Sequence, residues 1–223
     1  MINKEKYQEI INELGGKAIL VAVSKTKPIE DIQALYDLGH RDFGENYVQE
    51  LTDKEAQLPK DIRWHFIGHL QSNKVKYIAP FIHLIHGVDS YGLLKEINKQ
   101  AAKHAREIDC LLQVYIAKEE TKFGLDENEL HELLRITTIS ELTNIRINGL
   151  MGMASFSNNI DLVRSEFKYL KDLFDKYTQH KTLNTKLETL SMGMSADYKI
   201  ALEEGSNMVR IGSLLFGERN YNS

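Results

Sequence analysis

Short apolar runs alternate with helical patterns along the whole chain, and this alternation constrains the fold more than any other feature of the sequence. AILVAVS (18–24) is an unbroken apolar run, which is typical of parallel strands covered on both faces. Similar runs recur, each followed by a segment with helical periodicity or a helix cap. The predicted strands are 18–24, 41–43, 63–68, 83–88, 109–116, 146–153, 188–194 and 208–212.

Helices are predicted before the first strand and between the others. The opening helix spans 3–14, where Tyr7, Ile10 and Leu14 share one face and Gly15 follows. The later helices are predicted at 28–39, 46–57 and 70–79, after Asp89 or Ser90, after an Asp126/Glu129 capping box, around 160–174, at 196–204 and from 213 onward.

Eight strand–helix alternations after one extra helix predict an α/β fold. We expect a single-domain (β/α)₈ TIM barrel over residues 1–223, preceded by the N-terminal helix. No linker, repeat or low-complexity segment divides the chain. An open doubly wound sheet is the alternative, and it requires several of the short strands to be misassigned.

Composition excludes several classes of protein. The 223 residues are 42% hydrophobic and 27% charged, and the net charge of −4 gives no electrostatic case for nucleic-acid binding. No run approaches the ~20 apolar residues of a membrane span, and the N-terminus lacks the apolar core of a signal peptide. The single cysteine, Cys110, favours a reducing compartment. We expect a cytoplasmic protein and, because its exposed faces show no large apolar patch, a monomer.

Two lysines follow the first strand, where a barrel of this kind carries its function. Lys25 directly follows the apolar run, so its amine can lie at the barrel mouth in surroundings that disfavour the charged form. A neutral amine is what Schiff-base formation with an aldehyde requires. Lys27, next to Pro28, is predicted to point to solvent. By spacing alone, the commoner interpretation is that both are solvated loop lysines.

Glycine and serine follow the last two strands. Gly193-Met194-Ser195 and Gly212-Ser213 each lie between a strand and a helix, and Ser195 is predicted to be a helix N-cap. Backbone N–H groups at two such helix starts could hold a phosphate, and barrels often bind phosphate at this place. Ordinary capping by both serines is a compatible interpretation.

Arg210 lies inside the last predicted strand, where an arginine needs a partner. It could form a structural salt bridge, or donate a hydrogen bond to a ring nitrogen of a cofactor and keep that nitrogen unprotonated. Asn46, after the second strand, could be a helix N-cap or could contact the ring at the barrel mouth.

The histidines are not predicted to bind a metal. His65 and His69 do not share a helical face, and no cysteine ligands accompany them or His83 and His86. We interpret all four as packed or hydrogen-bonded side chains, with His65 or His69 the candidates for a place near the pocket. Lys118 and Lys122 follow the fifth strand and are either solvated or part of a basic rim, and their role stays open.

Taken together, several segments resemble one known family over nearly the whole chain. These segments are AVSKTKP (22–28), FGENYVQE (43–50), WHFIGHLQSNK (64–74), KFGL (122–125), NGLMGM (148–153), LSMGMSADYKIALEEG (190–205) and VRIGSLLFGER (209–219). The combination is similar to the YggS/PROSC family of pyridoxal 5′-phosphate (PLP) homeostasis proteins, although no single segment is specific.

The resemblance implies the fold of the alanine racemase N-terminal domain, with PLP bound covalently to Lys25 through a Schiff base. It implies that Ser195, after Met194, and Gly212-Ser213 bind the phosphate. It directs Arg210 toward the pyridine nitrogen and Asn46 beside the cofactor. Ser213 stands where the family commonly has threonine, which keeps the hydroxyl.

Three functions remain open at this point. The first is a PLP carrier that affects amino-acid and 2-oxo-acid balance and passes PLP to apoenzymes, with little or no turnover. It is favoured because alanine racemases take a second catalytic group from a separate β-domain, for which we expect no room before Ser223. The second is a single-domain amino-acid racemase, and the third is an unrelated barrel that binds a phosphorylated ligand without a Schiff base.

Overall fold

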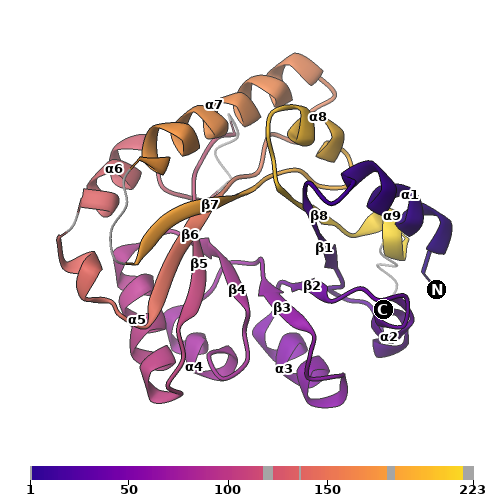
Figure 1. Ribbon diagram of the computed structural model, residues 1–223, viewed down its shortest axis with the longest axis horizontal. Coiled ribbons are helices and arrows are strands. Elements are labelled where there is room, and N and C mark those ends of the chain that lie inside the picture. The colour runs from indigo at the N-terminus through magenta and orange to yellow at the C-terminus, as the bar shows by residue number, and fades with distance from the viewer. Residues whose placement is uncertain (1, 118–122, 136, 180–183, 218–223) are drawn as a thin grey trace.

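A computed structural model describes residues 2–117, 123–135, 137–179 and 184–217 of the chain. Eight parallel strands follow one another around a closed ring in chain order, and β8 pairs with β1 to complete it. Helices surround the ring on its outside (Figure 1). The predicted (β/α)₈ barrel is therefore confirmed, and the open-sheet alternative is wrong.

The strands are short, and their side chains alternate between the barrel interior and the helix layer. They are β1 (Ile19–Val23), β2 (Asp42–Glu45), β3 (Arg63–Phe66), β4 (Leu84–Val88), β5 (Ile108–Gln113), β6 (Ile145–Met151), β7 (Thr185–Ser191) and β8 (Met208–Ile211). Ser191 pairs with Met208, and Ala22 pairs with both Phe43 and Ile211.

Most helices begin and end close to the predicted residues. They are α1 (Lys4–Leu14), α2 (Ile29–Tyr36), α3 (Val48–Gln57), α4 (Val75–Ile78), α5 (Tyr91–Lys103), α6 (Glu127–Arg135), α7 (Ile160–Thr178), α8 (Tyr198–Glu203) and α9 (Ser213–Phe216), with 3₁₀ turns η1 (Ser72–Lys74) and η2 (Thr137–Glu141). Ser90 is the cap of α5, and Asp126 and Glu129 form the reciprocal hydrogen bonds of the predicted capping box.

Two predicted boundaries are corrected. The helix expected at 70–79 is a 3₁₀ turn followed by the single turn of α4, because Ser72 and Asn73 are weak helix formers and Pro80 follows closely. The seventh strand lies three residues earlier than predicted and ends at Ser191. The turn that contains Gly193 and Ser195 is therefore longer than expected.

Two apolar clusters fill the molecule. The large one packs the outward faces of the strands against the helices, with Phe43, Trp64 and Phe167 among its buried side chains. The small one lies inside the ring and consists of Val21, Leu84, Leu111, Met151 and Met208. The remaining interior positions of the barrel include polar residues, among them His65, His86 and Arg210, which are all buried.

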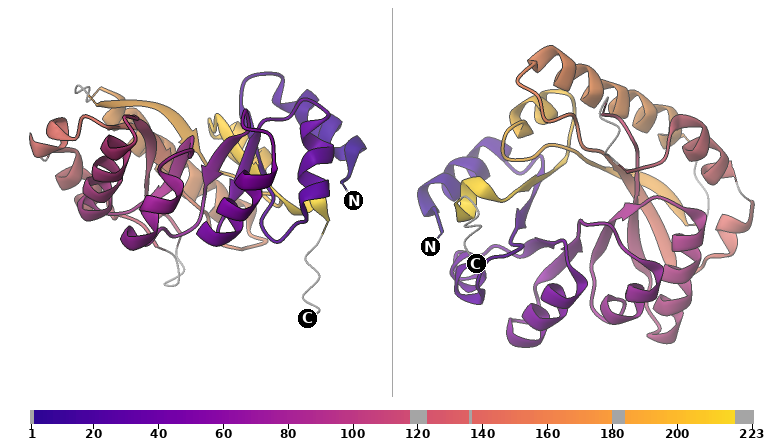
Figure 2. Two further views of the ribbon diagram at one scale, coloured as in Figure 1. Left: turned by 90° about the horizontal axis from the view of Figure 1, so that it is seen from below. Right: turned by 180° about the vertical axis from the view of Figure 1, so that it is seen from behind.

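The extra helix α1 lies beside α9, at the seam where β8 meets β1 (Figures 1 and 2). The backbone N–H of Asn3 donates to the Leu215 carbonyl oxygen at 2.8 Å, so α1 braces the segment that follows β8. In the part of the chain that the structure describes, none of the helices has the length and apolar character needed to span a bilayer.

Candidate functional site

A cavity of about 590 Å³ opens at the carboxyl ends of the strands. Seven residues selected from the sequence line it together, although they come from four separate strand ends or the turns that follow them. They are Lys25, Asn46, Met194, Ser195, Arg210, Gly212 and Ser213. In an α/β barrel this end of the strands is the ordinary place for a ligand site.

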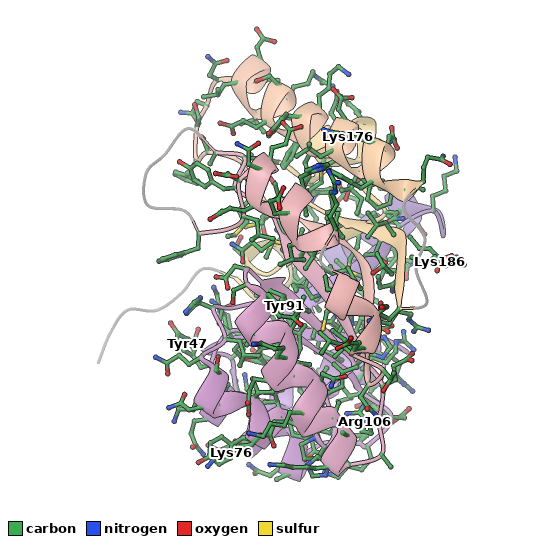
Figure 3. All side chains as sticks on the ribbon, turned by 90° about the vertical axis from the view of Figure 1, so that its left-hand side faces the viewer. Tyr47, Lys76, Tyr91, Arg106, Lys176 and Lys186 are labelled. Atoms are coloured by element: carbon green, nitrogen blue, oxygen red, sulfur yellow. The ribbon has the colours of Figure 1, made fainter. Side chains whose placement is uncertain are left out.

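Lys25 follows β1 and is half-buried at the cavity wall. The next residue, Thr26, has a φ of 61°, which is an unusual backbone conformation for a β-branched residue. Its N–H donates to Glu50 Oε1 at 2.6 Å, so a side chain of α3 holds this strained turn. Lys76 and Lys176, by contrast, lie on the outer helices α4 and α7 and are exposed (Figure 3).

Lys27 does not point to solvent as predicted. Its Nζ donates to the carbonyl oxygens of Phe216 and Gly217 at 2.9 and 3.1 Å, and its side chain lines the cavity. The carbonyl groups at the end of a helix attract a cation, which the sequence position next to Pro28 did not indicate. Lys27 thus ties the turn that carries Lys25 to the end of α9.

A buried ionic cluster lies behind Lys25, on the helix side of the barrel. Lys54 of α3 donates to Ser24 O, Glu45 Oε1 and Glu50 Oε1 at 2.8, 2.8 and 2.7 Å, which uses all three donors of its ammonium group. Ser24 Oγ also donates to Glu45 Oε1 at 2.7 Å. Glu45 Oε2 has no hydrogen-bond partner among the described residues, and Glu45 is fully buried.

Glu45 gives this cluster a pH dependence. Burial raises the pKa of Glu45 from 4.5 to about 6, although Lys54 acts in the opposite direction. The folded state therefore binds a proton more tightly than the unfolded state, and stability should fall as pH rises from about 4.5 to about 6. The expected loss is about 2 kcal/mol.

Glu45→Gln removes the titrating group and should flatten this part of the profile, because the amide oxygen can still accept from Ser24 and Lys54. Urea unfolding of both proteins at several pH values measures the difference. An equal slope in the variant between pH 4.5 and 6 would show that another group titrates there.

The turns after β7 and β8 contact each other. Gly212 N donates to Ser195 Oγ at 3.2 Å, so the two turns form one wall of the cavity. Gly193, with a φ of 95°, lets the first turn pass α8 closely, since a Cβ there would lie 2.6 Å from Ala201 Cβ.

Ser195 is not the N-cap of α8, as the sequence had predicted. That position belongs to Asp197, whose carboxylate accepts from Met194 N at 2.6 Å.

Arg210 lies on the inside of β8, at the base of the cavity. Its Nη1 donates to Ser191 O and Ser191 Oγ at 2.9 and 2.6 Å, and its Nη2 donates to Gly152 O at 3.0 Å. Burial lowers the pKa of Arg210 to about 10, which still leaves the guanidinium charged at pH 7. The charge of Asp197 acts against this lowering, but among the described residues no carboxylate forms an ion pair with Arg210. Of the two interpretations left open by the sequence, the structural salt bridge is therefore not supported.

Asn46 lies in the turn after β2 and also lines the cavity. It is not a helix cap, because Tyr47 occupies the N-cap position of α3. The turn after β3 passes tightly against it, since a Cβ at Gly68 would lie 2.4 Å from Asn46 O.

His69 lies in the turn after β3 and also lines the cavity. Its ring stacks on Phe123, with ring centroids 5.6 Å apart. Lys118 and Lys122 lie outside the described residues.

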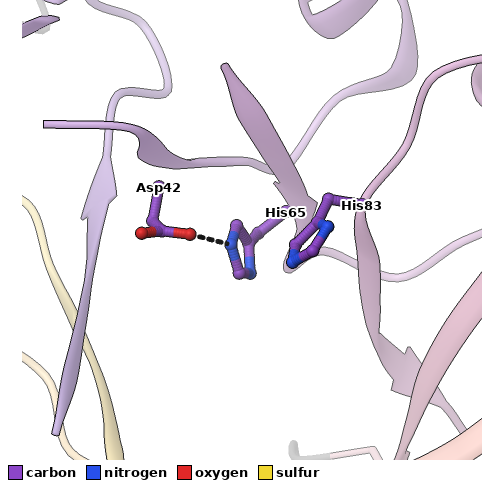
Figure 4. A group of neighbouring side chains, drawn as sticks. All are labelled: Asp42, His65 and His83. Atoms are coloured by element: carbon purple, nitrogen blue, oxygen red, sulfur yellow. Dashed lines mark hydrogen bonds and ion pairs between the residues drawn. The ribbon is translucent and has the colours of Figure 1, made fainter. Parts of the chain in front are cut away.

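The sequence did not indicate a polar group at the other end of the barrel. Asp42, His65 and His83 come from three neighbouring strands or their starts, and one ligand atom from each lies within 4.8 Å of the others (Figure 4). His65 Nε2 lies 3.1 Å from Asp42 Oδ1. The spacing of histidines along one strand does not indicate such a group, because the group depends on the register between β2, β3 and β4.

Known proteins share both the sequence and the fold. The family described as alanine racemase, N-terminal domain, matches residues 3–220. A pyridoxal phosphate homeostasis protein of Aquifex aeolicus is 44% identical over 205 residues, which cover 92% of this chain and 88% of the relative. PipY of Synechococcus elongatus, solved with PLP bound, is 34% identical with a TM-score of 0.87, covering 96% of this chain and 99% of PipY.

An alanine racemase of Clostridium difficile 630 shares the fold alone. It has a TM-score of 0.77 at 15% identity, and the match covers 98% of this chain but 57% of the racemase.

Proposed function

The chain belongs to the family of pyridoxal phosphate homeostasis proteins, which have the fold of the alanine racemase N-terminal domain, and from this premise we propose that it holds PLP by a Schiff base on Lys25. The observation that carries the proposal is the convergence of Lys25, Arg210 and the joined Ser195–Gly212 turns on one cavity. PLP supplies an aldehyde that condenses reversibly with amines. In that step the Lys25 amine adds to the aldehyde carbon, and the carbonyl oxygen leaves as water.

The wall formed by the turns after β7 and β8 fits a phosphate group. Ser195 and Ser213 supply hydroxyl groups, and the backbone N–H groups at the start of α9 have no acceptor within that helix. Because α8 and α9 have only six and four residues, we attribute the fit to these local donors rather than to helix dipoles.

Arg210 fits the pyridine nitrogen of the same ligand. A guanidinium group donates hydrogen bonds but does not accept them, so it would leave that nitrogen unprotonated. An unprotonated ring withdraws electrons less strongly and supports proton abstraction poorly. Support for a carrier that binds and releases PLP comes from the relative of Aquifex aeolicus, which is named as a PLP homeostasis protein.

The carrier function can be tested with one preparation. Holoprotein is mixed with an apoenzyme that needs PLP, and the recovered activity measures transfer. The same holoprotein is incubated with single enantiomers of amino acids, and chiral chromatography measures racemisation. We expect transfer, and racemisation no faster than with free PLP. Racemisation far above that background would support the racemase instead, with His69 at the cavity mouth as a candidate acid or base.

Ser195→Ala tests the phosphate wall. The variant removes a hydroxyl from the ligand and from Gly212 N, so PLP affinity should fall about 10-fold. Pyridoxal, which has the same aldehyde and ring but no phosphate, should bind both proteins equally. Absorbance titrations with the two ligands give the comparison, and an equal loss for pyridoxal would place the phosphate elsewhere.

The proposal also covers the domain organisation, cellular location, oligomeric state and recipients of the protein. We propose one functional domain over residues 1–223, a cytoplasmic location, a monomeric state and apoenzymes as recipients of PLP. Light scattering at several concentrations, with and without PLP, tests the monomeric state directly.

A further inference from the structure

A chain of buried polar side chains crosses the barrel from the cavity to its opposite end. It starts at Arg210, whose Nη1 donates to Ser191 Oγ at 2.6 Å. Ser191 Oγ lies 3.3 Å from His86 Nδ1, and His86 Nε2 lies 2.9 Å from His65 Nδ1. His65 Nε2 lies 3.1 Å from Asp42 Oδ1, where the chain ends.

The hydrogen bonds of this chain can all point in one direction. Asp42 is ionised and only accepts, so a neutral His65 carries its proton on Nε2 and accepts at Nδ1. His86 then donates from Nε2 and accepts at Nδ1 from the Ser191 hydroxyl, which in turn accepts from Arg210. Burial lowers the pKa of His86 well below its usual value, with the charge of Arg210 adding to the effect, so His86 is neutral.

None of the four side chains beyond Arg210 lines the cavity. Ser191, His86 and His65 are at most 1% exposed. Two residues of the interior apolar cluster are strand neighbours of this chain, because Leu84 pairs with His65 and Met208 pairs with Ser191. A polar chain in such surroundings is stable only when each of its groups has a partner. The interruption of one bond should therefore affect the others.

We propose that Asp42 anchors the far end of this chain and that Ser191, His86 and His65 are positioning residues, which hold the Arg210 guanidinium toward the bound ligand through their hydrogen bonds. The inference rests on the proposed function where it concerns PLP. It goes beyond that function because it assigns a role to residues at the far end of the barrel.

A metal site at Asp42, His65 and His83 is a weaker interpretation of the same residues. Arg63 donates to both carboxylate oxygens of Asp42, with Nε to Oδ1 at 2.7 Å, and His65 Nε2 bonds to the same Oδ1. A cation would have to displace these bonds beside a guanidinium charge. Although burial alone would raise the pKa of Asp42, the hydrogen bonds from His65 and Arg63 lower it strongly, which fits a fully used carboxylate.

The first test uses the protein without PLP. Nitrogen-15 NMR of the imidazole rings identifies the protonated nitrogen, and we expect Nε2–H on both His65 and His86. Asp42→Asn can donate as well as accept, so this single tautomer should be lost at His86 although the two residues do not touch. A proton on Nδ1 of His86 in the wild type, or an unchanged His86 in Asp42→Asn, would overturn the proposal.

The second test measures PLP affinity and the absorbance of the bound ligand. Asp42→Asn and His86→Leu should each weaken binding about 3- to 10-fold and shift the absorbance maximum, whereas His86→Gln, whose side-chain amide can both donate and accept, should stay within about 2-fold of the wild type. Arg63→Gln is the control, because it removes the other partner of Asp42 but leaves the chain intact. It should change neither readout.

The two proposals fail in different ways. An effect of His86→Leu with none from Asp42→Asn would reduce His86 to local packing and contradict the remote role of Asp42. Borohydride reduction of each sample reports separately on Lys25. Missing label on Lys25 in the wild type would contradict the proposed function, while the NMR result would still decide the direction of the chain.

Discussion

Lys25→Ala should lose covalent capture of PLP and bind it on the order of 100-fold more weakly, by ~2.7 kcal/mol. The expected loss is large because the amine forms the only covalent bond in the proposed complex, while the phosphate wall and Arg210 are unchanged. Absorbance titration measures the affinity, and the band of the Schiff base should be absent from the variant.

Lys27→Met is the matched control for this experiment. Lys27 lies in the same turn, lines the same cavity and has the same type of side chain, but its Nζ is used by the carbonyl oxygens of Phe216 and Gly217. Its replacement should keep the Schiff-base band and change PLP affinity by less than about 5-fold, the effect of roughly one hydrogen bond. If Lys27→Met lost the Schiff-base band and Lys25→Ala kept it, Lys27 would be the reactive lysine.

Lys54→Met should destabilise the fold by about 3–5 kcal/mol. The substitution leaves Glu45 buried without its cation and removes the hydrogen bonds from Lys54 to Ser24 O and Glu50. The midpoint of urea unfolding at pH 7 measures the loss. It should be smaller at pH 5, where Glu45 is protonated in the folded state, since burial raises its pKa to about 6.

Lys60→Met provides the comparison on the surface. Lys60 also pairs with a glutamate, Glu55 at 2.8 Å, but its side chain is 65% exposed. Such a pair contributes less than about 1 kcal/mol, so the variant should unfold close to the wild-type midpoint. Equal losses in the two variants would mean that burial of the Lys54 cluster has little influence on stability.

The barrel could be predicted because its signals are local. Each apolar run and each cap, such as Ser90 or the Asp126/Glu129 pair, is contained in a few consecutive residues. The candidate site could be assembled for a related reason. In a parallel barrel every strand ends at the same rim, so residues that directly follow strands, such as Lys25 and Gly212, meet without any knowledge of register.

The remaining features depend on contacts between strands or between a strand and a helix. Glu45 was not selected, because only the position of Lys54 on α3 reveals that the two meet. The link from His86 to His65 requires the register of β3 with β4, and the link to Ser191 spans the barrel interior. Ser195 was misassigned as a cap because the length of its turn depends on where β7 ends.

Reductive trapping tests the central claim most directly. Borohydride reduction of the PLP-loaded protein, followed by proteolysis and mass spectrometry, locates the modified lysine, with exposed lysines such as Lys76, Lys176 and Lys186 as internal controls (Figure 3). The account predicts one pyridoxyl-phosphate label, on Lys25. A label on another lysine, or no label above that of the exposed lysines, would contradict it.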